Sequence, residues 1–370
     1  MKRYHWLRQS QYLPPLSKAC EMCAKGSKMV VLVTGLCPAH CFYCPLSKKK
    51  QHKDVIFADE WQLKNEDDVQ ILIDEAYAIN ATGAGITGGD PLLVPQRTIK
   101  FIKILKQTFG KKFHIHLYTS GLKNTDFIPD MVDAGLDEIR FHPEPKYWRQ
   151  MQKSPFQKSI STIQQLPVKT AIEIPVIPGK SKEIIDLIDW ANDQNIDYIN
   201  LNELEFSEQN ENELYEKDFT MKNEVSAAAM GSQDTAFKVI HYFELHPVRI
   251  GIHYCSSAFK DAVQLKNRLK RRANNIATRF DIITEEGTLL KGIIEPTSKK
   301  SISALKSILE KKLNLHKNEY LINQKEQRIE LHPHLLDQHT STLNSLQIKC
   351  FIIEVYPTAD HLEVERMPLN

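Results

Sequence analysis

The sequence predicts an α/β fold in which a parallel sheet of six or so β–α units precedes a small α+β domain. Short runs of apolar and β-branched residues alternate with longer segments of helical period, and this alternation is typical of a parallel sheet with crossover helices. The pattern changes near Ala277, where hairpins and one amphipathic segment follow. We therefore expect an N-terminal arm (1–27), a barrel-like domain (28–274) and a C-terminal α+β domain (275–370).

Each expected strand is a short apolar run bounded by glycine, proline or polar turn residues. The expected strands are Lys28–Thr34, Gly83–Thr87, Phe113–Thr119, Glu138–His142, Lys169–Ile177, Tyr198–Leu204 and Val248–His253. Between them, apolar residues recur at helical spacing. The expected helices are Asp67–Ala81, Pro95–Phe109, Ile128–Ala134, Ser154–Gln165 and Ser181–Gln194.

Two regions follow other patterns. Ser207–Gln233 is polar and acidic, so we expect a loop or lid-like insertion with some helix, and a solvated surface excursion is the commoner alternative. The expected elements of the C-terminal domain are a hairpin of Arg279–Thr284 and Thr288–Ile294, an amphipathic segment Lys300–Leu313, and a closing hairpin of Leu346–Val355 and His361–Met367. No motif there points to chemistry.

Composition sets limits on the class of protein. The chain has 370 residues, 42% of them hydrophobic and 25% charged, with a net charge of +2, which favours no particular kind of partner. No apolar run is long enough to span a bilayer, and the start lacks the apolar core of a signal peptide. Five of the seven cysteines stand in C-x2-C or C-x3-C spacing, which indicates metal ligands in a reducing compartment. We expect a cytoplasmic protein with no membrane partner.

The most informative motif is Cys37-x3-Cys41-x2-Cys44, directly after the first expected strand. Thiolates hold iron–sulfur clusters, and a [4Fe–4S] cluster has four irons. Three cysteines leave one iron open to an exogenous molecule. The alternatives are a structural zinc site, which normally needs a fourth nitrogen or sulfur ligand, or three buried thiols.

This motif resembles the signature of radical S-adenosylmethionine (radical SAM) enzymes, in which the amino acid moiety of SAM chelates the open iron. The resemblance covers roughly Lys28 to Cys255 and implies an open, partial (β/α)6 barrel with its chemistry at the carboxyl ends of the strands. It also implies a [4Fe–4S] cluster, SAM, and an electron donor such as ferredoxin or flavodoxin. In the family, the residue before the third cysteine is usually aromatic and flanks the adenine, and here that residue is Tyr43.

Other strand ends extend the resemblance. Gly88-Gly89-Asp90 is similar to the family's Gly-Gly-Glu element, which implies that the Asp90 carboxylate binds the SAM ammonium group. The hydroxyls of Thr119 and Ser120 suit contact with a ribose or with the SAM carboxylate.

The next three strands supply further candidates. Arg140 is a candidate partner of the SAM carboxylate or a pocket-lining residue. Glu173 is a candidate pocket residue, with an ion pair to Arg140 as the alternative. Ile177, with Pro178 beside it, resembles the family position that packs on adenine, and Asn202 is a candidate ligand contact together with Glu203.

The remaining cysteines suggest a second site. Cys20 and Cys23 precede the first strand, and Cys255 follows the last, with His253 close by. Together they predict a zinc site or a second iron–sulfur cluster, with free thiols as the alternative. Cys350 lies in an apolar run and is expected to be core.

Two basic segments complete the picture. Lys266–Arg272 predicts a helix with a basic face, either a solvated connector or a patch that contacts the phosphates of RNA or a nucleotide. Lys48–Lys53 adds positive charge directly after the cysteine motif.

The resemblance implies reductive cleavage of SAM at the cluster to a 5′-deoxyadenosyl radical, which abstracts hydrogen from an unidentified substrate, an RNA, a peptide or a small molecule. Two alternatives stay open. One is an activase that generates a glycyl radical on a partner protein, and the other is a non-catalytic metal-binding module for nucleic acid.

Overall fold

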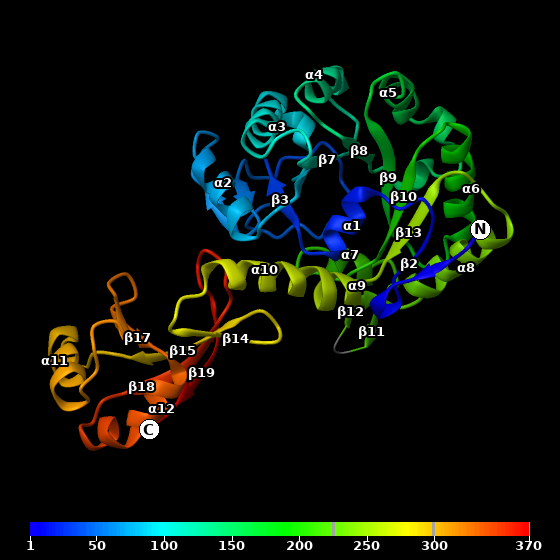
Figure 1. Cartoon of the computed structure of the whole chain (residues 1–370). Helices are drawn as coiled ribbons and strands as arrows, with labels where there is room; N and C mark the ends of the chain where they lie inside the picture. Colours follow the sequence, from blue (N-terminus) through cyan, green and yellow to red (C-terminus); the bar gives the residue numbers. More distant parts are fainter. Residues whose placement is uncertain (224–225, 298–299, 370) are drawn as a thin grey trace. The chain divides into compact units, whose positions relative to one another are not determined.

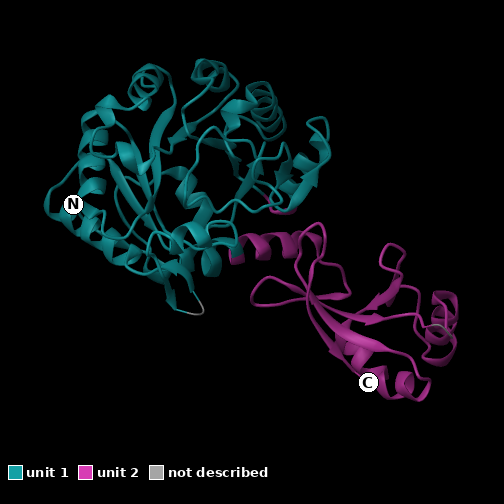
Figure 2. Ribbon diagram, turned by 180° about the vertical axis from the view of Figure 1, so that it is seen from behind, with its two compact units in different colours: residues 1–77, 81–265 teal, residues 78–80, 266–370 magenta. Residues whose placement is uncertain are grey.

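The computed structural model describes residues 1–223, 226–297 and 300–369. The chain divides into two compact units (Figure 1, Figure 2), unit 1 with residues 1–77 and 81–265 and unit 2 with residues 78–80 and 266–370. Each unit has its own main sheet. Within the described ranges, no helix combines the length and the apolar character needed to cross a membrane.

The core of unit 1 is a series of parallel strands that lie in chain order. These strands are β3 (Lys28–Leu32), β6 (Gly83–Thr87), β7 (His114–Thr119), β8 (Glu138–Phe141), β9 (Lys169–Val176), β10 (Tyr198–Glu203) and β13 (Gly251–Cys255). Neighbours in this series pair in parallel, so the expected sheet is confirmed. β13 begins later than expected, because its pairing with β10 starts at Gly251 opposite Tyr198.

Helices cover the outer face of this sheet (Figure 1). They are α2 (Val69–Ala78), α3 (Pro95–Phe109), α4 (Ile128–Asp133), α5 (Phe156–Ile163), α6 (Ser181–Asp193) and α8 (Ser232–Leu245), the last of which was not predicted. In α3, a proline at the start suits the first turn, and Phe101, Ile102 and Leu105 form the buried face. The short elements are η1 (Leu7–Gln9), η2 (Pro91–Leu93), η3 (Thr125–Phe127), η4 (Pro145–Tyr147), η5 (Met151–Lys153), α7 (Glu211–Tyr215), β11 (Met221–Asn223), β12 (Ser226–Ala229), α9 (Ser257–Phe259) and the π-helix η6 (Lys260–Leu265).

The barrel is open, because short antiparallel strands cover both edges of the sheet. β2 (Gln11–Leu13) pairs with β13 and with β1 (Tyr4–His5), and β4 (Ile56–Ala58) pairs with β3 and with β5 (Trp61–Leu63). The first and last parallel strands therefore pair with these covers and not with each other.

The N-terminal arm is an integral part of unit 1. Its helix α1 (Lys18–Ala24) lies inside the arc of strands (Figure 1), where Ser17 donates a hydrogen bond to Glu138 at 2.7 Å. Met22 fills the space left by Gly83, where a Cβ would lie 2.9 Å from its sulfur. The arm thus closes the interior of the barrel at the amino ends of the strands.

Unit 2 is the expected small α+β domain. Its elements are α10 (Lys266–Ile276), β14 (Asp281–Ile283), β15 (Leu289–Ile294), α11 (Ile302–Lys312), β16 (Tyr320–Asn323), β17 (Arg328–Leu331), α12 (Pro333–Ser345), β18 (Cys350–Val355) and β19 (Glu363–Pro368). The two expected hairpins, β14–β15 and β18–β19, are confirmed, and Cys350 is core as expected. β16, β17 and α12 were not predicted.

The second unit begins at Lys266, earlier than the expected 275. The reason is that α10 packs its buried Ala273 into a cluster with Leu289, Ile293 and Ile353 of the unit 2 sheet. The basic segment Lys266–Arg272 is therefore the first helix of unit 2, and not the end of the barrel domain.

Candidate functional site

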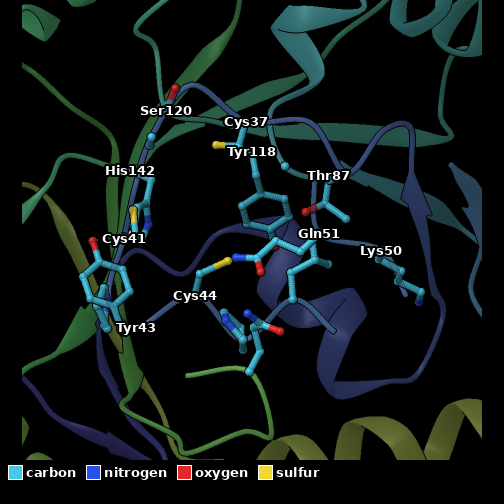
Figure 3. A pocket seen from close by; sticks show the side chains of 18 of the residues that line it. Cys37, Cys41, Tyr43, Cys44, Lys50, Gln51, Thr87, Tyr118, Ser120 and His142 are labelled. Atoms are coloured by element: carbon cyan, nitrogen blue, oxygen red, sulfur yellow. Dashed lines mark hydrogen bonds between the residues drawn. The ribbon is translucent and has the colours of Figure 1, made fainter. Parts of the chain in front are cut away.

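A cavity of about 800 Å³ lies at the carboxyl ends of the parallel strands of unit 1 (Figure 3). Thr87 of β6, Thr119 of β7, Glu173 of β9 and Asn202 of β10 line it, as does His142 just after β8. Side chains from successive strands converge here because parallel strands end at one edge of a sheet. The volume lies within the usual range for small-molecule sites.

The three motif cysteines lie on the wall of this cavity. The loop after β3 brings Cys37, Cys41 and Cys44 to its lining, and Figure 3 shows them around the pocket near Tyr118. Burial raises the pKa of Cys37 to about 12. Burial also raises the pKa of Cys41 to about 11, although a hydrogen bond with Tyr43 lowers it in part.

The donor set fits the implied cluster. Three thiols share one cavity that has room for an exogenous ligand, as a [4Fe–4S] cluster with one open iron requires. In the part of the chain that the structure describes, no group of three or more His, Cys, Asp or Glu side chains is gathered to hold a single metal ion.

Glycines let the loops at this site pack backbone against backbone. A Cβ at Gly88 would lie 2.2 Å from the Thr34 carbonyl oxygen, and one at Gly89 would lie 2.2 Å from that of Leu36. The Gly89 amide donates to Thr34 at 2.7 Å. The glycine pair, which also lines the cavity, is therefore required by the loop that carries the cysteines.

The structure gives no support to the prediction that the Asp90 carboxylate binds the SAM ammonium group. Asp90 is fully buried and does not line the cavity. Its Oδ1 accepts from the Leu92 amide at 3.0 Å and the Thr119 hydroxyl at 2.8 Å, and its Oδ2 accepts from the Ser120 amide and hydroxyl. With both oxygens occupied, Asp90 joins the end of β6 to the end of β7 and orients Thr119 and Ser120, which do line the cavity.

The structure also gives no support to the prediction that Arg140 pairs with the SAM carboxylate. Arg140 is buried beneath the cavity and donates to Glu138 and Glu173, each at 2.6 Å, and to Ser17 at 2.9 Å. The alternative, an ion pair with Glu173, is confirmed. Although burial favours the neutral acid, the Arg140 guanidinium holds the pKa of Glu173 below its usual value.

Glu173 and Asn202 lie together on the cavity wall, where Asn202 donates to Glu173 at 2.8 Å. Ile177, by contrast, is buried beyond the end of β9 and does not line the cavity, so its expected packing on adenine is not supported. Pro175 and Leu204 supply apolar lining instead. The alternation of β9 turns Glu173 and Pro175 to the same face.

Tyr43 lines the cavity, as expected of a residue beside the cluster motif. Its hydroxyl lies 3.0 Å from Nε2 of His142, which sequence reasoning had not singled out. Tyr118 was missed as well, and the only signal for both was their position at strand ends. The Tyr118 hydroxyl lies 3.2 Å from the Lys28 ammonium and 3.1 Å from His116, deep in the barrel.

The structure gives no support to a second metal centre on Cys20, Cys23 and Cys255. Cys20 is buried against the Arg140 guanidinium, whose nitrogen lies 3.5 Å from the sulfur and would repel a metal cation. Cys255 is also buried and accepts a hydrogen bond from Gln264 at 3.3 Å. Burial raises the pKa of Cys20 to about 11 and that of Cys255 to about 12.

The acidic insertion contributes to the wall of the cavity, so it is more than a solvated excursion, although most of its described residues are exposed. Gln209 and Glu213 line the cavity. Asn210 is buried and its amide donates to the carbonyl oxygens of Tyr43, at 3.2 Å, and Glu205, at 3.0 Å. The ring of Phe219 stacks with that of Phe42 at 6.3 Å. The insertion therefore holds the cysteine loop from its outer side.

Comparison with known proteins gives two family matches. Residues 31–191 match the radical SAM superfamily, and residues 287–369 match a domain of unknown function, DUF8061. The chain is 39% identical over 363 residues to a protein of Methanocaldococcus jannaschii provisionally named a glycyl-radical enzyme activating enzyme, and the match covers 96% of this chain and 93% of that protein.

Solved structures of Streptococcus suis SuiB are also similar. The structure bound to S-adenosylmethionine has 11% identity and a TM-score of 0.42, with 62% of this chain and 50% of that chain covered. The structure bound to the precursor peptide SuiA has 11% identity and a TM-score of 0.46, with 73% and 61% covered. The chain thus spans about half to three fifths of the length of SuiB.

Arg140→Leu is expected to lower the free energy of unfolding by about 3–5 kcal/mol, because Glu138 would be left buried, and Glu173 half-buried, without their cation. Urea unfolding followed by circular dichroism at pH 7 measures this loss. In the wild type Arg140 holds the pKa of Glu173 below its usual value, so the deficit should shrink as the pH falls and the Glu173 carboxyl group takes up a proton. Arg149→Leu, which breaks exposed pairs at 3.7 Å, is the control and should cost less than about 1 kcal/mol. Equal losses in the two variants would contradict the structural role of Arg140.

Asn210→Ala is expected to loosen the cysteine loop, because it removes three side-chain hydrogen bonds, one of them the buried bond to the Tyr43 carbonyl oxygen, and the loss of such a bond costs about 1–3 kcal/mol. In protein reconstituted with iron and sulfide under argon, the visible iron–sulfur absorbance should bleach several-fold faster on exposure to air. The control is Asn212→Ala, an exposed position in α7, the helix that follows Asn210. Identical bleaching rates would show that the insertion does not position the loop.

Proposed function

The chain belongs to the radical SAM superfamily, and we propose that it binds a [4Fe–4S] cluster through Cys37, Cys41 and Cys44, cleaves SAM reductively and abstracts hydrogen from a substrate. The observation that carries this proposal is that all three motif cysteines line one large cavity at the carboxyl ends of the parallel strands. When bound, the cluster and SAM supply the radical chemistry, and the protein supplies binding, orientation and exclusion of water.

The side chains on the cavity wall offer different groups for binding a ligand. Thr119 and Ser120 present hydroxyl oxygens whose protons are directed to Asp90, so they can accept hydrogen bonds from a ligand. Glu173 of β9 presents a carboxylate to the cavity, and Asn202 of β10 presents an amide. We assign these four residues, with Tyr43 and the backbone of Gly88 and Gly89, to SAM.

Asp90 and His142 act indirectly, because each orients side chains that line the cavity. Asp90 is a positioning residue, because it fixes both hydroxyl side chains without reaching the cavity. His142 orients the Tyr43 hydroxyl. Gln209 and Glu213 of the insertion narrow the cavity on the side of the cysteine loop and so help to keep water from the reacting groups.

We propose, as the substrate class, a glycine residue in a partner protein. This rests on the name of the relative that matches nearly the whole chain. The 5′-deoxyadenosyl radical would take one hydrogen atom from the glycine Cα, which yields 5′-deoxyadenosine and a glycyl radical. A small molecule, another peptide or an RNA is the alternative substrate, and a metal-binding nucleic-acid module without catalysis is the alternative function.

Cys41→Ala is expected to abolish cluster assembly and SAM cleavage, because a three-thiolate site loses one of its ligands. Iron should fall from about four per chain to near zero after anaerobic reconstitution. Iron analysis and the EPR spectrum of the dithionite-reduced protein measure the cluster, and release of 5′-deoxyadenosine measures cleavage. Cys350→Ala, in the core of unit 2, is the control. An unchanged iron content in Cys41→Ala would refute the cluster assignment.

Isotope transfer tests the substrate class without a known partner. Wild-type protein, SAM and dithionite are added to the macromolecular fraction of cells grown on glycine deuterated at Cα. The 5′-deoxyadenosine formed should carry deuterium, and extract from cells grown on deuterated alanine should give none. Cleavage without deuterium transfer would support the cleavage of SAM by this protein and exclude a glycine substrate. No cleavage with any reductant would instead favour the non-catalytic module.

A further inference from the structure

The turn of residues 47–53, which we call the basic turn, carries a concentration of positive charge in a nearly neutral chain. Lys48, Lys49 and Lys53 are exposed. None of these three lysines forms an ion pair with another residue in the described part of the chain. Lys50 is partly engaged, with Glu60 at 4.0 Å and the Phe57 ring at 4.4 Å.

The acidic residue that follows the turn does not neutralise it. The carboxylate of Asp54 accepts two hydrogen bonds from the Arg97 guanidinium, at 2.6 and 3.0 Å, and a third from Thr34. Asp54 therefore pairs with Arg97, which also pairs with Glu66 at 3.0 Å, and not with a lysine of the turn. The three lysines leave a local positive field that would attract an acidic surface.

The basic turn is fixed directly to the loop that carries the cysteines. The Gly35 amide donates to the Lys53 carbonyl at 2.8 Å, and the His52 amide donates to the Gly35 carbonyl at 2.9 Å. The approach is so close that a Cβ on Gly35 would lie 1.7 Å from the Lys50 carbonyl oxygen. Gly35 is two residues before Cys37, at most about 7 Å of extended chain. A protein docked on the turn would therefore lie next to the cluster ligands.

We propose that the basic turn is the docking surface for an acidic electron-donor protein that carries a low-potential flavin or iron–sulfur centre. The inference rests on the proposed function, in which each SAM cleavage consumes one electron. One electron passes from the reduced centre of the donor to the cluster, so the donor is oxidised by one electron for each SAM cleaved. The electron has a short route because the docking surface and Cys37 belong to one hydrogen-bonded loop structure.

The composition of the turn favours a protein over a nucleic acid. Its sequence, Ser-Lys-Lys-Lys-Gln-His-Lys, contains no arginine and no phenylalanine, tyrosine or tryptophan. Arginine gives bidentate phosphate recognition, and aromatic rings provide the stacking on which single-stranded RNA binding depends. Mobile lysine ammonium groups instead suit long-range attraction between complementary protein surfaces, which raises the association rate.

The test compares two triple variants of the full-length protein. The first, Lys48→Glu, Lys49→Glu and Lys53→Glu, reverses the turn without changing a side chain that lines the cavity. The control, Lys103→Glu, Lys111→Glu and Lys112→Glu, makes the same change of charge on exposed lysines of unit 1. Lys111 and Lys112 precede β7 and so lie at the opposite end of the sheet.

Two measurements are made on reconstituted protein under argon. Calorimetric titration with an acidic flavodoxin measures docking, and 5′-deoxyadenosine release measures turnover driven by reduced flavodoxin or by dithionite. We expect the turn variant to bind flavodoxin at least about tenfold more weakly and to need correspondingly more of it for turnover. Dithionite-driven cleavage should stay at the wild-type rate, and the control variant should match the wild type. Added salt should weaken flavodoxin binding to the wild type and have little effect on the turn variant.

Flavodoxin binding that is equal in the turn variant and the wild type would overturn the proposal. A wild-type protein that binds a single-stranded RNA oligonucleotide through these lysines and does not bind flavodoxin would also overturn it. If the turn variant also loses dithionite-driven cleavage, turnover no longer reports on docking. The affinity for flavodoxin measured by calorimetry then tests the proposal alone. If the wild type does not cleave SAM with dithionite, the proposed function is refuted. The docking surface is then tested by the calorimetric titration with flavodoxin, which does not require cleavage.

Discussion

The site depends on the close approach of three stretches of backbone. The chain at Thr34–Leu36 accepts hydrogen bonds at 2.7 Å from the amides of Gly89 and Asp90 after β6. On its other side, Gly35 forms two hydrogen bonds with the basic turn. Glycine is needed at positions 35, 88 and 89 because a Cβ at any of them would overlap a carbonyl oxygen. These contacts determine where the loop leaves β3 and therefore where Cys37 begins the motif.

Asp90 extends this arrangement from β6 to β7. A fully buried carboxylate is tolerated because its oxygens accept from two backbone amides and two hydroxyls. Thr119 and Ser120 are thereby held at the edge of the cavity before any ligand binds. Such preorganisation lowers the entropic cost of placing a ligand next to the cysteines.

Beneath the cavity, the barrel interior is polar where barrels of this kind are usually apolar. Lys28 and Arg140 face Glu138 and Glu173 in one buried region, so the formal charges balance. The guanidinium of Arg140 also joins Ser17 and Cys20 of the N-terminal arm to the floor of the cavity. Buried ions are expensive to desolvate, and this network specifies how α1 fits inside the strands.

The sequence by itself determined the order of the parallel strands, the helices that cover the sheet apart from α8, and the cysteine motif at the end of the first strand. These features depend on local periodicity and spacing, which a single sequence records directly. It did not determine the roles of Asp90 and Arg140. Both stand at strand ends that suit ligand contact, but their partners come from segments far away in the chain. Only the tertiary structure decided that Asn210 supports the cysteine loop, because a hydrogen bond across 167 residues leaves no local pattern. A polar residue at the end of a strand gives the same sequence pattern whether its side chain binds a ligand or a buried partner. Only the packing in the folded structure distinguishes these two cases.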